Sequence, residues 1–171
     1  EIFLSERALS ASGSVIIPIM EGTRPILIEV QGLVSTATYG NPQRNATGFD
    51  MRRLSMLLAI LDKRLGYQMI TKDVFVNIVG GLKIDEPSLD LAILCAIASS
   101  NQDITVDSKT VICGEVGLSG EVRSISHIDR RINESEKLGF KKMICPIQNL
   151  KKLKRSTSLE LIGVSTVYEA L

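Results

Sequence analysis

Ser88 is the residue of this sequence that is best placed for nucleophilic chemistry. It follows the glycine pair at 80–81 and lies in the first turn of a helix that we predict over 87–99, with Pro87 also in that turn. Backbone N–H groups in a first helical turn have no partner within the helix, so they are able to stabilise an oxyanion beside this hydroxyl. The segment therefore predicts a candidate nucleophile.

A serine nucleophile needs a proton acceptor, and the sequence offers few near Ser88. A lysine can serve when burial lowers the pKa of its amine. Lys83 is close in sequence but is expected in solvent, and His127, the only histidine, is expected at an exposed helix start beside Asp129. A second interpretation of Ser88 is therefore a structural residue at the helix N-terminus.

Two segments resemble the Lon-type Ser-Lys peptidases over most of residues 70–171. The first resembles the segment that holds the nucleophile, and the second resembles the segment that precedes the catalytic lysine. They are Asp85-Glu86-Pro87-Ser88, and Gly114-Glu115-Val116 with Leu118, Gly120 and Val122. The resemblance implies a Lon-peptidase-like fold.

The lysine that a Ser-Lys dyad requires is replaced in this register. Counted from Gly114, its position falls on Asp129, whose carboxylate cannot take the role of a neutral amine. We interpret Asp129 instead as part of a capping-box variant, three residues after Ser126. The resemblance then implies no catalytic residue, with Ser88 as a vestigial nucleophile.

Matches along the whole chain resemble the C-terminal domain of the bacterial RadA/Sms DNA recombination and repair family. They are Phe3-Leu4-Ser5-Glu6-Arg7, Ala11-Ser12-Gly13-Ser14, Glu21-Gly22-Thr23-Arg24-Pro25, Glu29-Val30-Gln31, Pro42-Gln43-Arg44-Asn45-Ala46-Thr47-Gly48-Phe49-Asp50 and Arg53-Leu54. The resemblance implies a hexameric ring that drives branch migration on single- or double-stranded DNA, with a recombinase filament as a possible further partner. It also implies that ATP, Mg and Zn belong to preceding domains. This sequence has no G-x-x-x-x-G-K-[ST] motif, so we expect no cofactor or metal here.

Four arginines are the candidates for contacts with DNA phosphates, because affinity for DNA comes mostly from Lys and Arg. Arg44 is the only charge between Glu29 and Asp50, in a long polar segment. Arg52 and Arg53 begin the next helix, and Arg123 ends a strand. A denser basic cluster is more typical of a solvated helix face: Lys151-Lys152-Leu153-Lys154-Arg155. An isolated surface arginine is usually just solvated, which is the simpler interpretation of each. A ring would multiply any patch that faces its channel, so modest local charge suffices.

Hydrophobic periodicity and turn residues predict an α/β domain with a mixed sheet, in the order ββαβαββαβαβα. We expect residues 1–12 to be a tether from a preceding ATPase domain and 13–171 to be the Lon-peptidase-like domain. The expected strands are 14–20, 25–34, 73–79, 110–116, 121–124, 142–145 and 159–164, and the expected helices are 50–65, 87–99, 126–138, 148–153 and 166–171, with a loop over 35–48.

Composition narrows the function classes. With 20 Lys and Arg against 19 Asp and Glu, the chain is no polyelectrolyte, and 4% aromatic residues disfavour base stacking as the main mode of nucleic-acid binding. The three cysteines form no metal or disulfide pattern and suit a reducing cytoplasm. We find no signal peptide or apolar membrane span, and the chain, which lacks an initial Met, reads as a piece of something longer or a processed form.

Three functions remain open at this point. The first is a scaffold without catalysis that binds DNA and forms hexamers. The second is a working Ser-Lys-type peptidase that uses Ser88. The third is an oligomerisation module without nucleic-acid contact.

Overall fold

The computed structural model describes residues 4, 8, 11–38 and 40–171. Most of the expected tether at 1–12 lies outside the described residues. Nine strands, five α-helices and one 3₁₀ helix follow one another along this described part of the chain. They are β1 (Ser14–Glu21), β2 (Arg24–Thr36), β3 (Arg44–Thr47), α1 (Met51–Leu65), η2 (Met69–Thr71), β4 (Lys72–Ile78), α2 (Leu89–Gln102), β5 (Thr110–Ile112), β6 (Glu115–Val116), β7 (Val122–Arg123), α3 (Ile128–Lys137), β8 (Lys142–Pro146), α4 (Ile147–Lys151), β9 (Glu160–Val164) and α5 (Val167–Ala170).

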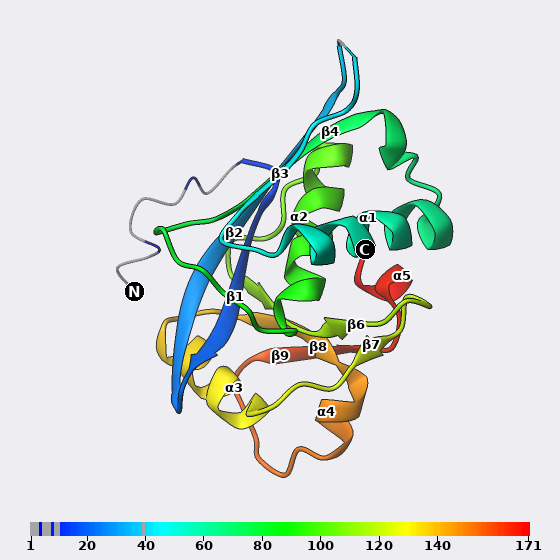
Figure 1. Ribbon diagram of the computed structural model, residues 1–171. Helices are drawn as coiled ribbons and strands as arrows, with labels where there is room; N and C mark the ends of the chain where they lie inside the picture. The colour runs from blue at the N-terminus through cyan, green and yellow to red at the C-terminus, as the bar shows by residue number, and fades with distance from the viewer. Residues whose placement is uncertain (1–3, 5–7, 9–10, 39) are drawn as a thin grey trace.

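The strands form a seven-stranded mixed sheet in the order β3-β4-β2-β1-β5-β8-β9 and a separate β6-β7 pair (Figure 1). β1 and β2 are an antiparallel hairpin, and β2 also pairs antiparallel with β4. The pairs β1-β5, β5-β8, β8-β9 and β3-β4 are parallel. The predicted α/β class with a mixed sheet is confirmed.

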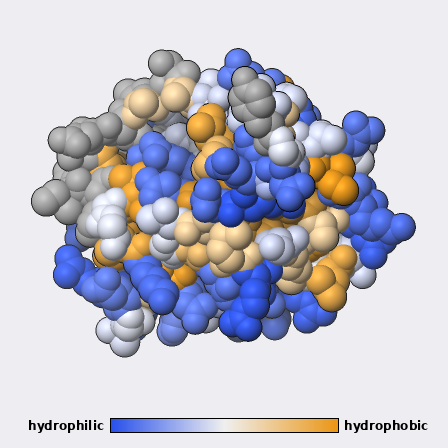
Figure 2. All heavy atoms as spheres, turned by 45° about the horizontal axis from the view of Figure 1, so that its top comes forward, coloured by the Kyte–Doolittle hydropathy of each residue, from blue (hydrophilic) through white to orange (hydrophobic). Residues whose placement is uncertain are grey.

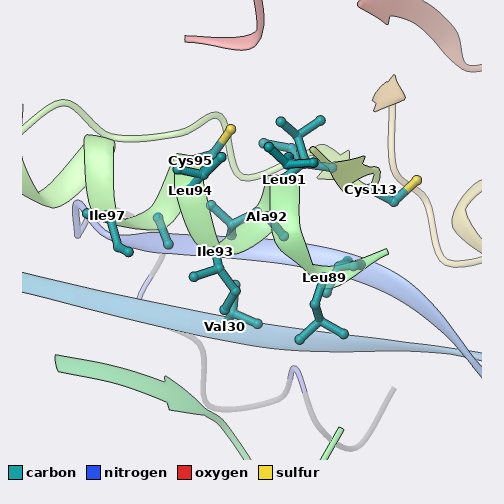
Figure 3. Close-up of a cluster of buried hydrophobic side chains, with 14 of the residues drawn as sticks. Val30, Leu89, Leu91, Ala92, Ile93, Leu94, Cys95, Ile97 and Cys113 are labelled. Atoms are coloured by element: carbon teal, nitrogen blue, oxygen red, sulfur yellow. The ribbon is translucent and has the colours of Figure 1, made fainter. Parts of the chain in front are cut away.

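Helix α2 is the centre of the core. Apolar residues occur on every side of this helix, and the residues Leu89–Ser99 are all buried. Figure 3 shows Ile93 and Leu89 directed toward Val30 of β2, with Cys95 on another side of the helix. Gly32 lets β2 approach the helix closely, since a Cβ built on it would lie 3.0 Å from the Ala96 carbonyl carbon.

Helix α1 begins and ends as its sequence predicts. Asp50 is the N-cap and accepts a hydrogen bond from the Arg52 backbone N–H at 2.8 Å. Gly66 ends the helix in the left-handed conformation, at φ 68°. The buried side of α1 is leucine-rich and belongs to the core.

Three local predictions are wrong. The loop expected over 35–48 contains β3, which pairs with β4, because backbone pairing with a neighbouring strand outweighs its polar composition. The strand expected over 110–116 divides into β5 and β6, although β6 and β7 do form the expected hairpin. Helix α3 has no Ser126/Asp129 capping box; its N-cap is His127 at φ 55°, without a side-chain cap.

A few large apolar side chains reach the surface. On the face displayed in Figure 2, apolar groups lie between hydrophilic ones. The described residues that are large, apolar and exposed are Leu33, Met51, Ile70, Ile104, Leu118, Tyr168 and Leu171. Within the β1–β2 hairpin, Leu33 alone is in this group. Among the described residues, none of the helices has the length and hydrophobicity that a bilayer crossing requires.

Candidate functional site

Ser88 lies at the start of α2, as predicted, but its hydroxyl is enclosed by protein. The residue is 2% exposed and occupies the N-cap position at φ −62° and ψ −15°, where its side chain makes no capping hydrogen bond. The hydroxyl instead donates to a carboxylate oxygen of Glu86, two residues earlier. The structural interpretation of Ser88 therefore holds in a different form, as a member of a side-chain network rather than as a cap.

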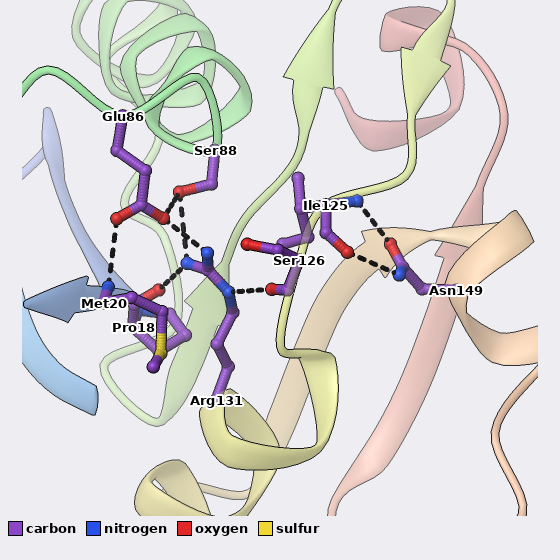
Figure 4. A network of polar contacts seen from close by, with 8 residues as sticks. All are labelled: Pro18, Met20, Glu86, Ser88, Ile125, Ser126, Arg131 and Asn149. Atoms are coloured by element: carbon purple, nitrogen blue, oxygen red, sulfur yellow. Dashed lines mark hydrogen bonds and ion pairs between the residues drawn. The ribbon is translucent and has the colours of Figure 1, made fainter. Parts of the chain in front are cut away.

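The second partner of this hydroxyl is Arg131 of α3, as Figure 4 shows. Arg131 Nη1 donates to Ser88 Oγ at 3.1 Å, and Nη2 pairs with Glu86 Oε1 at 2.5 Å. Backbone carbonyls take the remaining donors: Nε donates to Ser126 O at 2.8 Å, and Nη1 also donates to Pro18 O at 2.7 Å. Arg131 is 1% exposed.

Glu86 joins the network to the sheet. Its Oε2 accepts a hydrogen bond from the Met20 backbone N–H at 3.0 Å, near the end of β1. The network of Glu86, Ser88 and Arg131 therefore connects β1, the start of α2 and α3. We call it the Ser88 network.

The chemistry open to the Ser88 network is limited by Arg131. A guanidinium stays protonated in proteins and only donates hydrogen bonds, so it cannot accept the hydroxyl proton as a neutral lysine would. The Glu86 carboxylate accepts from the hydroxyl while it is ion-paired with Arg131. This arrangement orders three segments of the chain.

The backbone N–H groups that we expected as an oxyanion hole are already used. Leu89 N–H donates to Glu86 O and Asp90 N–H to Pro87 O, each at 3.1 Å, and Leu91 N–H donates to Gly114 O at 3.0 Å. An oxyanion hole requires donors directed at the place where the oxyanion forms. In this structure these three donors are directed at backbone carbonyls.

The residues weighed as proton acceptors lie elsewhere. Asp129 and His127 are exposed at the start of α3, and Lys83 is exposed in the connection between β4 and α2. The α3 residue at the Ser88 hydroxyl is Arg131, two positions after the one that the register count indicated.

Arg131 was not predicted as a site residue, although its spacing in the sequence held a signal. Arg131 lies on one face of α3 with Ile128, Ser135 and Leu138, three, four and seven residues away, and Arg131 and Ser135 are both buried. A charged residue on the apolar stripe of a helix indicates a buried ion pair. The partner, Glu86, could not be identified because it is distant in sequence.

A second charged pair lies under the start of α1. Arg53 Nε donates to Asp90 Oδ1 at 2.7 Å, and Nη2 pairs with Asp90 Oδ2, which also accepts from Val116 N–H at 3.0 Å. Asp90 is fully buried, and this burial raises the pKa of its carboxyl, against the opposing effect of Arg53. The hydrogen bond with Asp90 in turn raises the pKa of Arg53. Arg53 is therefore held by a buried carboxylate, which leaves it less available to a DNA phosphate than a cation without an acidic partner.

The other three candidate cations differ in their partners. Arg44 is half-buried and donates to the Met69 carbonyl at 2.8 Å. The Arg52 side chain is 95% exposed, with Asp50 at 3.9 Å. Arg123 is exposed and pairs with Glu121 at 3.1 Å. Arg44 and Arg52 thus keep the most capacity for an external anion.

The basic cluster at 151–155 is partly neutralised. Arg155 pairs with Glu136 at 3.0 Å, while Lys151, Lys152 and Lys154 are exposed. The cluster begins at the end of the short helix α4. This agrees with a solvated face.

A cleft lies beside Arg52. It has a volume of about 570 Å³ and runs between the connection from β3 to α1 and the loop 81–85, with Arg52, Lys83, Asp50 and Asp85 among its lining residues. Two basic and two acidic side chains leave this lining without net charge. Among the described residues, no group of three or more His, Cys, Asp or Glu side chains could hold a metal ion.

Comparison with known proteins gives a consistent result. The family model ChlI, described as subunit ChlI of Mg-chelatase, matches residues 28–149. Proteins named DNA repair protein RadA match all of this chain: 48% identity in Halalkalibacterium halodurans and 49% in Bacillus subtilis, covering 37% of each relative, and 44% in Streptococcus pneumoniae, covering 41%. The chain therefore spans less than half the length of these relatives.

Proposed function

The chain belongs to the family described as subunit ChlI of Mg-chelatase and is homologous over its whole length to the C-terminal part of DNA repair protein RadA, and from this we propose that it is a non-proteolytic scaffold domain of a RadA-type DNA repair protein. In this proposal the fold is Lon-peptidase-like. The domain supports assembly into a hexameric ring and contacts DNA phosphates. Catalysis by ATP hydrolysis belongs to other parts of such a protein.

One observation carries the non-proteolytic part of the proposal: the Ser88 hydroxyl is buried between Glu86 and Arg131. A nucleophile must reach its substrate and lose a proton to a base. Ser88 is 2% exposed. The α3 residue that contacts its hydroxyl, Arg131, is a permanent cation rather than a neutral amine. The first requirement is unmet in this geometry, and the carboxylate that accepts the hydroxyl hydrogen bond, Glu86, is ion-paired with Arg131.

A labelling experiment tests this part. We expect a fluorophosphonate probe to leave the protein unlabelled and casein to stay intact, with no difference between the unsubstituted protein and Ser88→Ala. An active serine hydrolase in the same assay provides the positive control. Labelling or cleavage that disappears in Ser88→Ala would restore the peptidase alternative.

The DNA-contact part of the proposal rests on Arg44 and Arg52. Within the described part of the chain Arg44 has no carboxylate partner, and Arg52 has nearly its whole side chain in water. Neutralised phosphates release counterions, so each lost contact reduces the steepness of log K against log salt by about 0.7 for single strands and 0.9 for duplexes. Phosphate contacts carry no sequence information, so no base preference is expected.

DNA binding across a salt series separates this proposal from the oligomerisation module. We expect Arg44→Ala and Arg52→Ala each to weaken binding and to flatten the salt dependence, because each removes a phosphate contact. Arg24→Ala, at the exposed first residue of β2, is the matched control and should leave both the affinity and the salt dependence unchanged. Absence of DNA binding even in the assembled protein would favour the oligomerisation module.

A further inference from the structure

Three lysines from two distant segments meet at one end of the parallel part of the sheet. Lys109 directly precedes β5, and Lys141 and Lys142 lie at the start of β8. The backbone N–H groups of Lys141 and Lys142 both donate to the Lys109 carbonyl, at 2.8 and 3.2 Å. Because neighbouring strands lie about 4.8 Å apart, these side chains leave the backbone from one small region. We call this group the lysine cluster.

Among the described residues, the lysine cluster takes part in no ion pair. Lys109 and Lys141 are exposed and Lys142 is half-buried. The Asp107 carboxylate accepts a hydrogen bond from the Lys109 backbone N–H at 2.7 Å. Glu160 of β9 is opposite Lys142 in the strand register. The charge of these lysines is therefore available to an external anion.

The backbone of the lysine cluster is held firmly. All three residues belong to or adjoin paired strands, and the Lys109 ammonium lies 5.9 Å from the ring centroid of the buried Phe140. An ammonium over an aromatic ring is attracted electrostatically. The lysine cluster thus lies at fixed strand ends. Lys151, Lys152 and Lys154 lie instead at and after the end of the short helix α4.

We propose that the lysine cluster is a second phosphate-binding surface, which contacts the backbone of a nucleic acid. The proposal rests on the proposed function as a DNA-contacting domain. Lysine binds phosphate as a compact point charge without the directional fork of arginine, so contacts here are independent of base sequence.

The cluster lies away from Arg44, the first residue of β3. β3 is at one edge of the sheet and β5 is four positions further in the strand order. At about 4.8 Å per strand, this separation is roughly 20 Å. A single phosphate group cannot bridge it, so the lysine cluster and Arg44 contact different phosphates.

The test is a charge-neutralising triple variant, Lys109→Gln with Lys141→Gln and Lys142→Gln. Binding of a labelled duplex and a labelled single strand is measured by fluorescence anisotropy across a salt series. We expect at least tenfold weaker binding at low salt, and a log–log slope reduced by about 2.7 on the duplex. The control is Arg24→Gln with Lys63→Gln and Lys152→Gln, three exposed cations on separate segments. It removes the same charge and should change affinity less than threefold.

The outcomes separate this inference from the proposed function. Unchanged binding by the cluster variant, or an equal loss in the control, overturns the lysine cluster and leaves the Arg44 and Arg52 contacts standing. Absence of binding by the unsubstituted protein at low salt overturns both. Lys→Arg at the same three positions keeps the charge and should restore affinity, which separates loss of charge from loss of fold. Loss of binding to polyglutamate with DNA affinity unchanged would assign the cluster to an acidic protein and overturn the proposal.

Discussion

A buried arginine decides the character of the Ser88 network. Arg131 directs its donors at one carboxylate, one hydroxyl and two backbone carbonyls. Buried charges are tolerated when they are paired and hydrogen-bonded in this way. The position that would have to activate Ser88 is thus occupied by a residue that fixes it in place.

Arg131→Met tests this role at the scale of one residue. Removing one partner of a buried ion pair leaves the other charge buried and unpaired. We therefore expect the free energy of unfolding to fall by about 3–5 kcal/mol. Urea unfolding at pH 7 measures it. Arg130→Met, an exposed neighbour that bonds to the Thr23 carbonyl, should change stability by about 0.5 kcal/mol or less. Equal effects of the two substitutions would contradict the structural role.

The Arg53–Asp90 pair predicts a pH-dependent defect. Burial already raises the pKa of Asp90, and Arg53 opposes that rise. In Arg53→Met the rise is larger, so the native state binds a proton that the unfolded state releases above about pH 4. Stability should then fall as pH increases through the raised pKa, because protons are bound preferentially by the folded form.

The measurement for Arg53→Met is urea unfolding at pH 4.5 and pH 7. We expect a loss of about 2 kcal/mol at pH 7, less than the roughly 3–5 kcal/mol of a fully buried pair because the Arg53 side chain is 32% exposed, and a smaller loss at pH 4.5. Arg52→Met provides the control and should show no such difference. A loss that is equal at both pH values would mean that Asp90 stays ionised without its partner.

At the scale of elements, local signals predicted most of the fold. The leucine stripe, Asp50 and Gly66 define α1, and the apolar composition of 89–98 marks α2 as buried. β3 was not predicted because its residues are polar and its strand character comes from pairing with β4. The start of α3 was misplaced because His127, in a left-handed conformation, rather than a capping side chain, precedes the helix.

The candidate site was less predictable than the elements that hold it. Ser88 was placed correctly at the start of α2, since glycine and proline signals are local. Its partner Arg131 lies 43 positions later in the sequence, and only the packing of α3 against β1 brings the two residues together. Likewise, the ion pair of Arg53 was not predicted, because its carboxylate partner Asp90 is on another helix.

The contact between β2 and α2 gives a prediction for these two elements. In Gly32→Ala the new methyl would lie 3.0 Å from the Ala96 carbonyl carbon and 3.1 Å from the Ile97 nitrogen, so strand and helix must separate. We expect a loss of about 1–3 kcal/mol in urea unfolding. Gln31→Ala, at the exposed neighbouring position, is the control. Unchanged stability of Gly32→Ala would mean that the helix moves freely on the sheet.

For the whole molecule, one continuous core joins the β1–β2–β4 half of the sheet to the β5–β8–β9 half. The buried apolar cluster includes residues from both halves, and α2 contributes to it along most of its length. Cys95 of α2, Cys113 after β5 and Cys145 of β8 are free and buried within it. These thiols therefore report on the opening of distant parts of the molecule.

The three thiols predict a single cooperative opening. Burial raises the pKa of Cys95 and of Cys145 to about 12 and raises that of Cys113 further, so at pH 8 the reactive thiolate forms only when the core opens. We expect a thiol reagent such as 5,5′-dithiobis(2-nitrobenzoate) to react slowly in buffer and with all three thiols in guanidinium chloride. Variants that each retain one cysteine should react at rates within about threefold of one another, since each requires the same global unfolding. A tenfold faster reaction at Cys145 alone would instead show that the β5–β8–β9 half, which carries the lysine cluster, opens independently of α2.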